Sequence, residues 1–388
     1  MIRKSKAFLY AGAACLMLLS IFQDAAAQTS TAVPFLLISP SSRNSAMGEA
    51  GVAVANDVSA VFWNPAGLGF QKGMEFSLNH SNWLPQFQQS DLYFEYASYK
   101  MDLPSTGGTI GAALTYLNLG QFERRDEANI SLGQFKSYEI AFSVAYGMRL
   151  DEDLSLGIGI RLIHSSLSAV ATAREQGSGT ATAVAGDIGV LYRPSKLTLP
   201  FSDTDIGGKL SLGASITNMG PSISYIDEAQ SDPLPTALRL GFSYDIVKEK
   251  YNTLTFTTDV TKLLVSRTDK TADPFFTAVT KSWEGGNVVN SFTLGTGFEY
   301  WYSQLVALRF GFFHEDPSQG NRRFLTFGAG VRYDIYGFDF SYISTAISDD
   351  DTPSPLSETL RFTLTVNWDR GTGPADDGTR IPADDAAN

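Results

Sequence analysis

Apolar and polar residues alternate along most of the chain, from Met74 to Trp368. The last segment shows the pattern best, because every second residue from Arg361 to Asn367 is polar or charged, and the positions around them are apolar: Leu360, Phe362, Leu364, Val366 and Trp368. A period of two residues is typical of a β-strand with one apolar face. Residues 154–162, 238–245 and 306–312 repeat the pattern. The chain is therefore predicted to be all-β over this region.

Two architectures share this alternation, a soluble β-sandwich and a transmembrane β-barrel. Three features favour the barrel. The segments run about ten to thirteen residues, which suits a tilted membrane span better than a soluble strand. Their polar faces are rich in Gly, Ser and Thr. Aromatic residues gather near the segment ends, as an interfacial girdle requires: Trp83, Tyr99, Tyr146, Tyr192, Tyr244, Tyr300, Trp301, Tyr302, Tyr333, Tyr336 and Trp368.

Counting the segments predicts fourteen antiparallel strands, an even number, as a closed bacterial outer-membrane barrel needs. Long connections are expected on the outer side, at residues 120–133, 166–181, 219–235, 266–289 and 348–356. Tight turns are expected on the inner side, such as residues 150–152 and 301–302, with residues 194–207 as a longer exception. The strands are expected to begin near Met74, Ser90, Gly107, Gln134, Asp153, Thr182, Gly208, Thr236, Asn252, Asn290, Ser303, Arg322, Tyr336 and Ser357.

The stretch of residues 34–69 has neither clean alternation nor a sustained helical period. It is dense in Gly, Ala, Ser and Asn, and Asn64-Pro65 is a turn signal. A compact irregular piece ahead of a long all-strand region has two interpretations, a plug inside the barrel or a tethered N-terminal arm. We expect residues 28–72 to form this piece and residues 73–368 to form the barrel.

The two ends of the chain differ from the rest. Arg3, Lys4 and Lys6 precede an apolar run that ends in three alanines, which is the order of a secretory signal peptide, so we expect residues 1–27 to be removed. Cys15, the only cysteine, lies in that run, and the mature chain would have no disulfide. Residues 369–388 are rich in Gly, Pro and Asp and are expected to form a disordered acidic tail.

Charge excludes one class of partner. The net charge is −12, and removing the signal peptide takes away three basic residues and one acidic residue, which leaves −14. An acidic protein without a basic run has no electrostatic footprint for nucleic acid.

Charges of both signs fall on the polar faces of the predicted strands. An arginine facing lipid near mid-depth costs about 2–4 kcal/mol, so we expect these side chains to face the interior. A paired network that fills the lumen is favoured over a conduction path, and Arg43 in the irregular piece is the expected partner of an inward acid. The charges are Arg161, Arg239, Arg309, Arg332 and Arg361, and Glu95, Glu139, Asp187, Asp245, Glu299 and Asp339.

Signals of catalysis are weak. His80, His164 and His314 lie in separate predicted strands without the spacing of metal ligands. No G-x-S-x-G motif is present. We expect no catalytic residue, no metal and no cofactor.

Several motifs resemble a known family. NPAGL at residues 64–68, preceded by NDVSAVFW, resembles the hatch of FadL-type outer-membrane transporters, and VPFLLISPSSRNSAMGEAGVAVANDVSAVFWNPA is similar to the opening of the PorV/PorQ family of the type IX secretion system. Five later segments resemble PorV members of that family: NMGPSISY (residues 218–225), LPTALRLGFSY (234–244), DVTKLLV (259–265), GNRRFLTFGAGVRYDIYGFDFSY (320–342) and SPLSETLRFTL (354–364).

The resemblance implies a fourteen-stranded FadL-like barrel in the outer membrane of a Bacteroidota-type bacterium, acting as a carrier and anchor for secreted proteins. The implied partners are a SprA/Sov-type translocon, cargo with a C-terminal secretion domain, a PorU-type sortase in its attachment complex, and the lipopolysaccharide of the outer membrane. The plug contacts carried over from the family are Pro34, Phe35, Arg43, Met47, Gly48, Asn64 and Pro65.

Two other functions stay open. The hatch motif and the barrel also suit a FadL-like importer of hydrophobic small molecules, which would need a continuous apolar pocket between plug and wall and a lateral opening in a kinked strand. A lipid-modifying enzyme of the outer membrane ranks last, because no nucleophile–base pair is recognisable.

Overall fold

The computed structural model describes residues 31–87, 91–125, 129–168, 179–199, 203–225, 231–268, 271–284, 288–344 and 355–368. The predicted signal peptide and the predicted acidic tail lie outside these residues. Within them, no helix is long and apolar enough to cross a bilayer.

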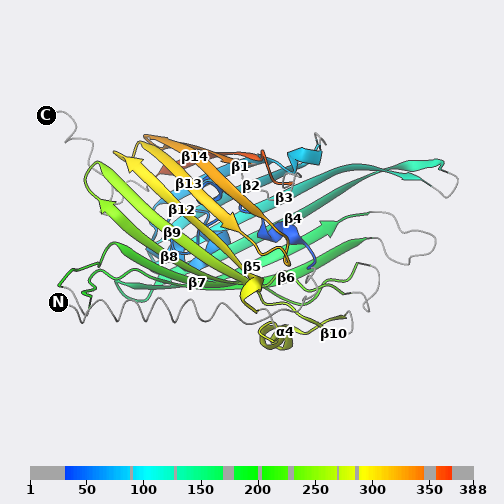
Figure 1. Ribbon diagram of the computed structural model, residues 1–388, viewed down its shortest axis with the longest axis horizontal. Helices are drawn as coiled ribbons and strands as arrows, with labels where there is room; N and C mark the ends of the chain where they lie inside the picture. Colours follow the sequence, from blue (N-terminus) through cyan, green and yellow to red (C-terminus); the bar gives the residue numbers. More distant parts are fainter. Residues whose placement is uncertain are drawn as a thin grey trace.

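Fourteen strands of the described chain close into one antiparallel barrel (Figure 1). Each strand pairs with its neighbours in sequence, and β1 pairs with β16 from Met74–Trp368 to Ser81–Arg361 to complete the ring. The predicted fold class, strand number and antiparallel order are confirmed. The strands are β1 (Met74–Asn82), β2 (Tyr93–Leu103), β3 (Gly108–Arg125), β4 (Ser131–Arg149), β5 (Leu154–Ser166), β6 (Thr180–Tyr192), β7 (Leu210–Met219), β8 (Ala237–Lys248), β9 (Asn252–Leu263), β12 (Phe292–Tyr302), β13 (Val306–His314), β14 (Arg323–Tyr333), β15 (Tyr336–Ile343) and β16 (Leu360–Trp368).

Side chains sort by the expected period of two. On β1, Glu75, Ser77 and Asn79 are buried on the inner face, whereas Phe76 and Leu78 are exposed on the outer face. Similar exposed apolar residues lie on the outer faces of all the other long strands except β2 and β9, as a surface that faces lipid requires.

Three expectations about side-chain direction are wrong. Glu95 faces outward, because β2 directs its buried face through Phe94 and Tyr96, and its carboxylate lies 2.7 Å from the Nδ1 atom of His80 on the outer wall. Trp301 and Trp83 do not join the outer girdle. Trp301 lies beneath two inward guanidinium groups, and Trp83 packs against the buried Phe94 ring.

Two predicted connections are also wrong. Residues 120–133 were expected to form a loop, but β3 and β4 stay paired through most of this stretch, from Gly120–Ser137 to Arg125–Ser131. Gly120 has φ +91° at a register shift, so the strand bends there and continues. The turn expected at residues 301–302 lies at 303–305, since β12 continues to Tyr302.

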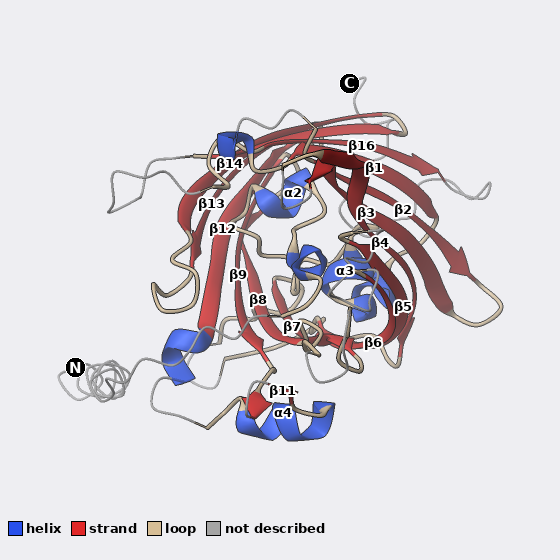
Figure 2. Cartoon of the chain, turned by 90° about the vertical axis from the view of Figure 1, so that its right-hand side faces the viewer, coloured by secondary structure: helices blue, strands red, loops and turns tan. Residues whose placement is uncertain are grey.

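Residues 31–73, which we call the plug, lie inside the barrel and carry α2 (Ser42–Ser45), α3 (Ala60–Trp63), η1 (Pro34–Leu37) and η2 (Pro65–Phe70) (Figure 2). The plug begins at the end of the barrel with the long connections, where the Ala32 N–H donates to the Pro233 carbonyl (3.0 Å). It ends near the short turns, where Ser155 Oγ donates to the Ala66 carbonyl (2.7 Å). The plug therefore runs through the whole lumen.

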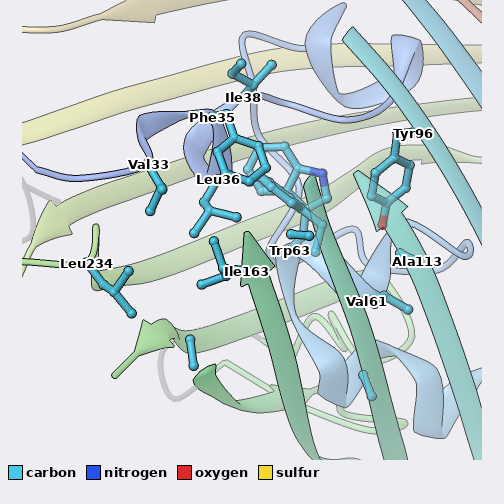
Figure 3. Close-up of a cluster of buried hydrophobic side chains, with 14 of the residues drawn as sticks. Val33, Phe35, Leu36, Ile38, Val61, Trp63, Tyr96, Ala113, Ile163 and Leu234 are labelled. Atoms are coloured by element: carbon cyan, nitrogen blue, oxygen red, sulfur yellow. The ribbon is translucent and has the colours of Figure 1, made fainter. Parts of the chain in front are cut away.

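Apolar side chains of the plug pack with the wall near the long connections (Figure 3). Phe35 and Leu36 of η1 belong to the same buried cluster as Ile163 of β5 and Leu234 of the β7–β8 connection. This cluster closes the lumen at that end by hydrophobic burial.

Elsewhere the plug and the wall meet backbone to backbone. Seven inward glycines, which we call the glycine belt, lie so close to plug backbone atoms that an added Cβ atom would come within 2.0–2.7 Å of one. Only glycine permits so close an approach. The belt consists of Gly147, Gly157, Gly213, Gly241, Gly295, Gly297 and Gly311.

Candidate functional site

A chain of six charged side chains joins the plug to the wall. Arg43 of α2 donates from Nε and Nη2 to both carboxylate oxygens of Glu299 on β12, at 2.9 and 2.8 Å. Its Nη1 atom lies 2.8 Å from Asp57 of the plug. Glu299 also accepts from Arg309 of β13 at 2.8 Å. The pairing expected of Arg43 with an inward acid is therefore present, and it is bidentate, the strong geometry for this pair.

The chain continues along the wall. Arg309 donates from Nη1 to Asp339 of β15 at 2.8 Å, and Arg332 of β14 donates to the other oxygen of Asp339 at 2.7 Å. We call these six residues, three cations and three anions, the plug lock. Because every charge has a partner of opposite sign, the plug lock can be buried without a net charge.

The plug lock also fixes the ionisation of its plug members. Burial alone would raise the pKa of Asp57, but the charge of Arg43 and hydrogen bonds from Ser59 outweigh burial and lower that pKa from its ordinary value of 3.8. Burial would lower the pKa of Arg43, yet the carboxylates of Glu299 and Asp57 raise it well above its ordinary value. Both groups are therefore charged at neutral pH.

The other predicted inward arginines are placed around the plug and do not join the plug lock. Arg161 of β5 pairs with Asp187 of β6 at 3.1 Å and also contacts Asn218. Arg239 of β8 donates to Thr217 at 2.6 Å, and its guanidinium lies over the rings of two plug residues, Phe62 and Trp63. Arg361 of β16 is buried and donates to Ser45 of the plug at 2.7 Å.

The remaining predicted plug residues differ in their surroundings. Met47 is buried, and the Gly48 N–H donates to Thr326 Oγ1 at 3.0 Å. The Asn64 amide donates to the Val190 carbonyl of β6 at 3.0 Å, and Pro65 lies directly against Gly157. Phe35 is in the apolar cluster, whereas Pro34 is exposed at the start of η1.

One anchoring residue was missed by the sequence reasoning. A single carboxylate oxygen of Asp259 on β9 accepts from the backbone N–H groups of Gly51 and Val52 at 2.6 and 2.8 Å. The signal was available, because the apolar neighbours Phe256 and Val260 face outward and the period of two then directs Asp259 inward.

One cavity between plug and wall, formed by described residues, is small and polar. It has a volume of about 30 Å³ and is lined mostly by polar and charged side chains, among them Ser41, Glu75, Ser98 and Thr363. It has room for little more than water. Of the described residues, no group of three or more His, Cys, Asp or Glu side chains could hold a metal ion.

An apolar groove lies on the inward-facing side of the extension of β3 and β4. β3 pairs with β2 only as far as Asn118, and β4 pairs with β5 only from Tyr138 onward. The rest of β3 and β4 therefore extends past the neighbouring strands as a projecting hairpin (Figure 1). Phe122 and Phe135 pair across it with stacked rings at 5.7 Å. They line a groove of about 380 Å³ together with Leu92, Leu119, Ser137 and Leu167.

The extension offers two kinds of contact to a partner. The groove presents apolar surface, and among the described residues no neighbouring strand pairs with the hairpin beyond Asn118 and Tyr138, where the Gln121 N–H donates to Asp91 Oδ2 at 3.2 Å. Unpaired strand edges bind extended peptide segments by main-chain hydrogen bonds, and neighbouring apolar pockets then select side chains.

Comparisons with known proteins agree with this architecture. A family model described as type IX secretion system protein PorV matches residues 22–270. Among solved structures, the Ralstonia pickettii toluene transporter TbuX is 12% identical, with a TM-score of 0.50 over 84% of this chain and 98% of that one. A deltaS2 mutant of the TodX monoaromatic hydrocarbon channel is 13% identical, with a TM-score of 0.50 over 85% of this chain and 97% of that one.

A Pseudomonas aeruginosa FadL homologue is 10% identical, with a TM-score of 0.45 over 85% of this chain and 98% of that one. No curated protein sequence matches the chain. At these identities the structural likeness concerns the fold alone, which is that of a FadL-like outer-membrane barrel.

Proposed function

The chain belongs to the PorV family of type IX secretion system proteins, and from this premise we propose that it is the carrier and anchor of secreted cargo in that system. It is an outer-membrane β-barrel. In the proposed role it accepts proteins with a C-terminal secretion domain from a SprA/Sov-type translocon. It then delivers them to a PorU-type sortase, which attaches them to surface lipopolysaccharide.

The observation that carries the proposal is a filled lumen beside an exposed docking surface. The plug lock, the glycine belt and the apolar cluster hold the plug over the length of the barrel. We place recognition at the outer end, where the extension of β3 and β4 supplies an apolar groove and, among the described residues, strand edges that no other strand covers. Such a surface suits an extended segment of a protein partner better than a small solute.

In this role the inward charges are structural. The plug lock, Arg239 and Arg361 keep the plug seated while cargo binds outside, and they form no path for ions. A carrier gains from a rigid, closed barrel because loops on a rigid scaffold keep their binding geometry.

An importer of hydrophobic small molecules is the second candidate. The apolar groove favours it, and the toluene transporter TbuX shares the fold. The groove, however, is lined by strand and connection residues and by no residue of the plug. The cavity described above between plug and wall is polar and about 30 Å³. An importer needs an apolar passage at that place, so we rank this function second.

Substitution of the groove tests the proposal. In a strain that lacks the gene, the variant Phe122→Ser with Phe135→Ser should leave cargo unprocessed in the cell while the barrel still assembles, as judged by heat-modifiable mobility on gels. The matched control is Glu123→Ser with Gln134→Ser, because these two residues pair on the opposite face of the same hairpin. The control should process cargo normally.

The outcomes separate the two functions. Normal cargo processing in both variants would remove the groove from the carrier mechanism. Normal processing together with lost uptake of a hydrophobic nutrient in the Phe122/Phe135 variant would establish the importer instead.

A further inference from the structure

The connection between β9 and β12 leaves the barrel sideways. Its described parts, residues 264–268, 271–284 and 288–291, carry β10 (Arg267–Thr268), β11 (Thr271–Ala272), α4 (Phe275–Lys281) and η5 (Val288–Ser291). The end-on view places α4 and β11 outside the ring of strands, and the side view places α4 beside the wall (Figures 1 and 2). We call these described parts the lateral arm.

The lateral arm is attached to the wall over a lysine. Lys262 follows the outward register of β9, beside Leu238 of β8 and Phe292 of β12, yet only 2% of its surface is exposed. Its ammonium group lies 5.2 Å from the Trp283 ring and 5.4 Å from the Phe292 ring, and it donates to Ser291 Oγ. Cation–π contacts of this kind stabilise a charge that is removed from water. The arm thus shields a cation that would otherwise face lipid.

The free surface of the lateral arm is aromatic and apolar. Phe276 of α4 is 83% exposed, Val289 of η5 is 59% exposed and Trp283 is 45% exposed. Phe275 packs edge-to-face against Phe276 at 5.2 Å, which widens the patch. Trp283 packs against Phe292 of β12 with ring centroids 6.1 Å apart, and on the same outward face of β12 the Leu294 side chain is exposed.

Two of the four charged residues in the described arm pair with each other, and Arg267 pairs with Asp232 of the β7–β8 connection. Lys281 lies 3.4 Å from Asp273 and donates to Thr268 at 2.6 Å. Asp273 also accepts from Ser266 at 2.6 Å. A surface with few charges and exposed aromatic side chains suits the boundary between acyl chains and headgroups, where tryptophan and other aromatic rings are enriched.

We infer that the lateral arm is an interfacial membrane anchor, which inserts Phe276, Trp283 and Val289 into the outer leaflet beside β8, β9 and β12. The observations that carry the inference are the sideways position of the arm, its attachment over Lys262, and the packing of Trp283 against Phe292 on the outward face of β12. The anchor fixes this sector of the barrel at one depth in the bilayer.

Depth-dependent quenching tests the anchor. In the full chain with Cys15→Ser, Phe276→Cys is labelled with an environment-sensitive fluorophore, and the protein is placed in phosphatidylcholine nanodiscs that contain lipids with a nitroxide on the acyl chain. Leu240→Cys on the lipid-facing wall is the positive control, and Ser318→Cys in the exposed β13–β14 connection is the aqueous control. Quenching at residue 276 should reach about half or more of that at residue 240, since interfacial residues lie at the edge of the hydrocarbon.

A label at residue 276 that is quenched no more than at residue 318 would overturn the anchor. A label that is shielded in native outer membranes and crosslinks there to a protein, without lipid quenching in nanodiscs, would also overturn it and make the arm a protein-docking surface. Val289→Cys serves as a second position if Phe276→Cys does not assemble, as judged by heat-modifiable mobility.

Discussion

Removing the guanidinium of Arg43 should unseat the plug while the barrel stays folded. The variant Arg43→Ala breaks the bidentate contact with Glu299 and leaves Asp57 without its cation. Breaking a buried ion pair by removing one partner costs about 3–5 kcal/mol. Glu299 keeps Arg309, and the Asp57 side chain is 24% exposed, so the cost should be near the lower end of that range.

A loss of about 3 kcal/mol lowers the ratio of seated to displaced plug by roughly a hundredfold. In planar bilayers the wild-type protein should be nearly silent, and Arg43→Ala should show frequent openings. Arg332→Ala is the matched control, because it removes an arginine from the far end of the plug lock while Asp339 keeps Arg309. We expect that control to cost about 1 kcal/mol or less and to stay silent.

A double-mutant cycle completes the test. If Arg43 acts through Glu299, the costs of Arg43→Ala and Glu299→Ala should not add, since each removes the same contact. Additive costs, or an Arg43→Ala channel as silent as the wild type, would refute the idea that the plug lock holds the plug.

Three further predictions concern the plug. Deleting residues 31–69 should leave a foldable barrel that conducts ions in planar bilayers, and unchanged silence would mean that something else blocks the lumen. Burial raises the pKa of Glu49, so the charged carboxylate destabilises the folded state as the pH rises. Glu49→Gln should therefore raise the unfolding temperature at neutral pH. This gain in unfolding temperature should shrink as the pH falls toward 4.5, the ordinary pKa of glutamate. Gly157→Ala, whose Cβ would lie 2.2 Å from the Ala66 nitrogen, should cost about 1–3 kcal/mol and open the channel, whereas Gly186→Ala, with no atom nearer than 3.9 Å, should be tolerated in both assays.

The strands could be predicted because lipid and plug impose opposite demands on alternate residues. All fourteen begin within three residues of the predicted positions. The extension of β3 and β4 was missed because Gly120 and Gly133 looked like loop ends. Both have positive φ, yet Phe122 and Phe135 keep pairing between them. Glycines at a bulge and glycines in a loop look the same in one sequence.

Side-chain direction was harder to predict where both faces of a strand look alike. On β2 the outward face carries Tyr93 and Glu95, and the inward face carries Tyr96 and Lys100. Each face has an aromatic ring and a charge, so alternation does not say which one meets lipid. The partner of Lys100 decides, because Glu75 lies 3.6 Å away on the inner face of β1.

The plug lock could be predicted only in part. Arg309, Glu299 and Asp339 can be predicted to face inward from the two-residue alternation of their strands. The position of Arg43 cannot be predicted in this way, because the plug sequence has no regular period. Its contact with Glu299 joins residues 256 positions apart. Contacts at that range depend on the folded path of an irregular segment, which local patterns do not encode.

The glycine belt also bears on how the protein is assembled. Plug and wall fit backbone against backbone, which leaves no clearance for the plug to slide into a finished ring. The plug precedes every strand in the chain, and the seam between β1 and β16 joins the first strand to the last. The sheet therefore has to curl around a plug that is already in place, with the seam closing last. During assembly, the open sheet must be held at the membrane until the plug occupies its position against the glycine belt.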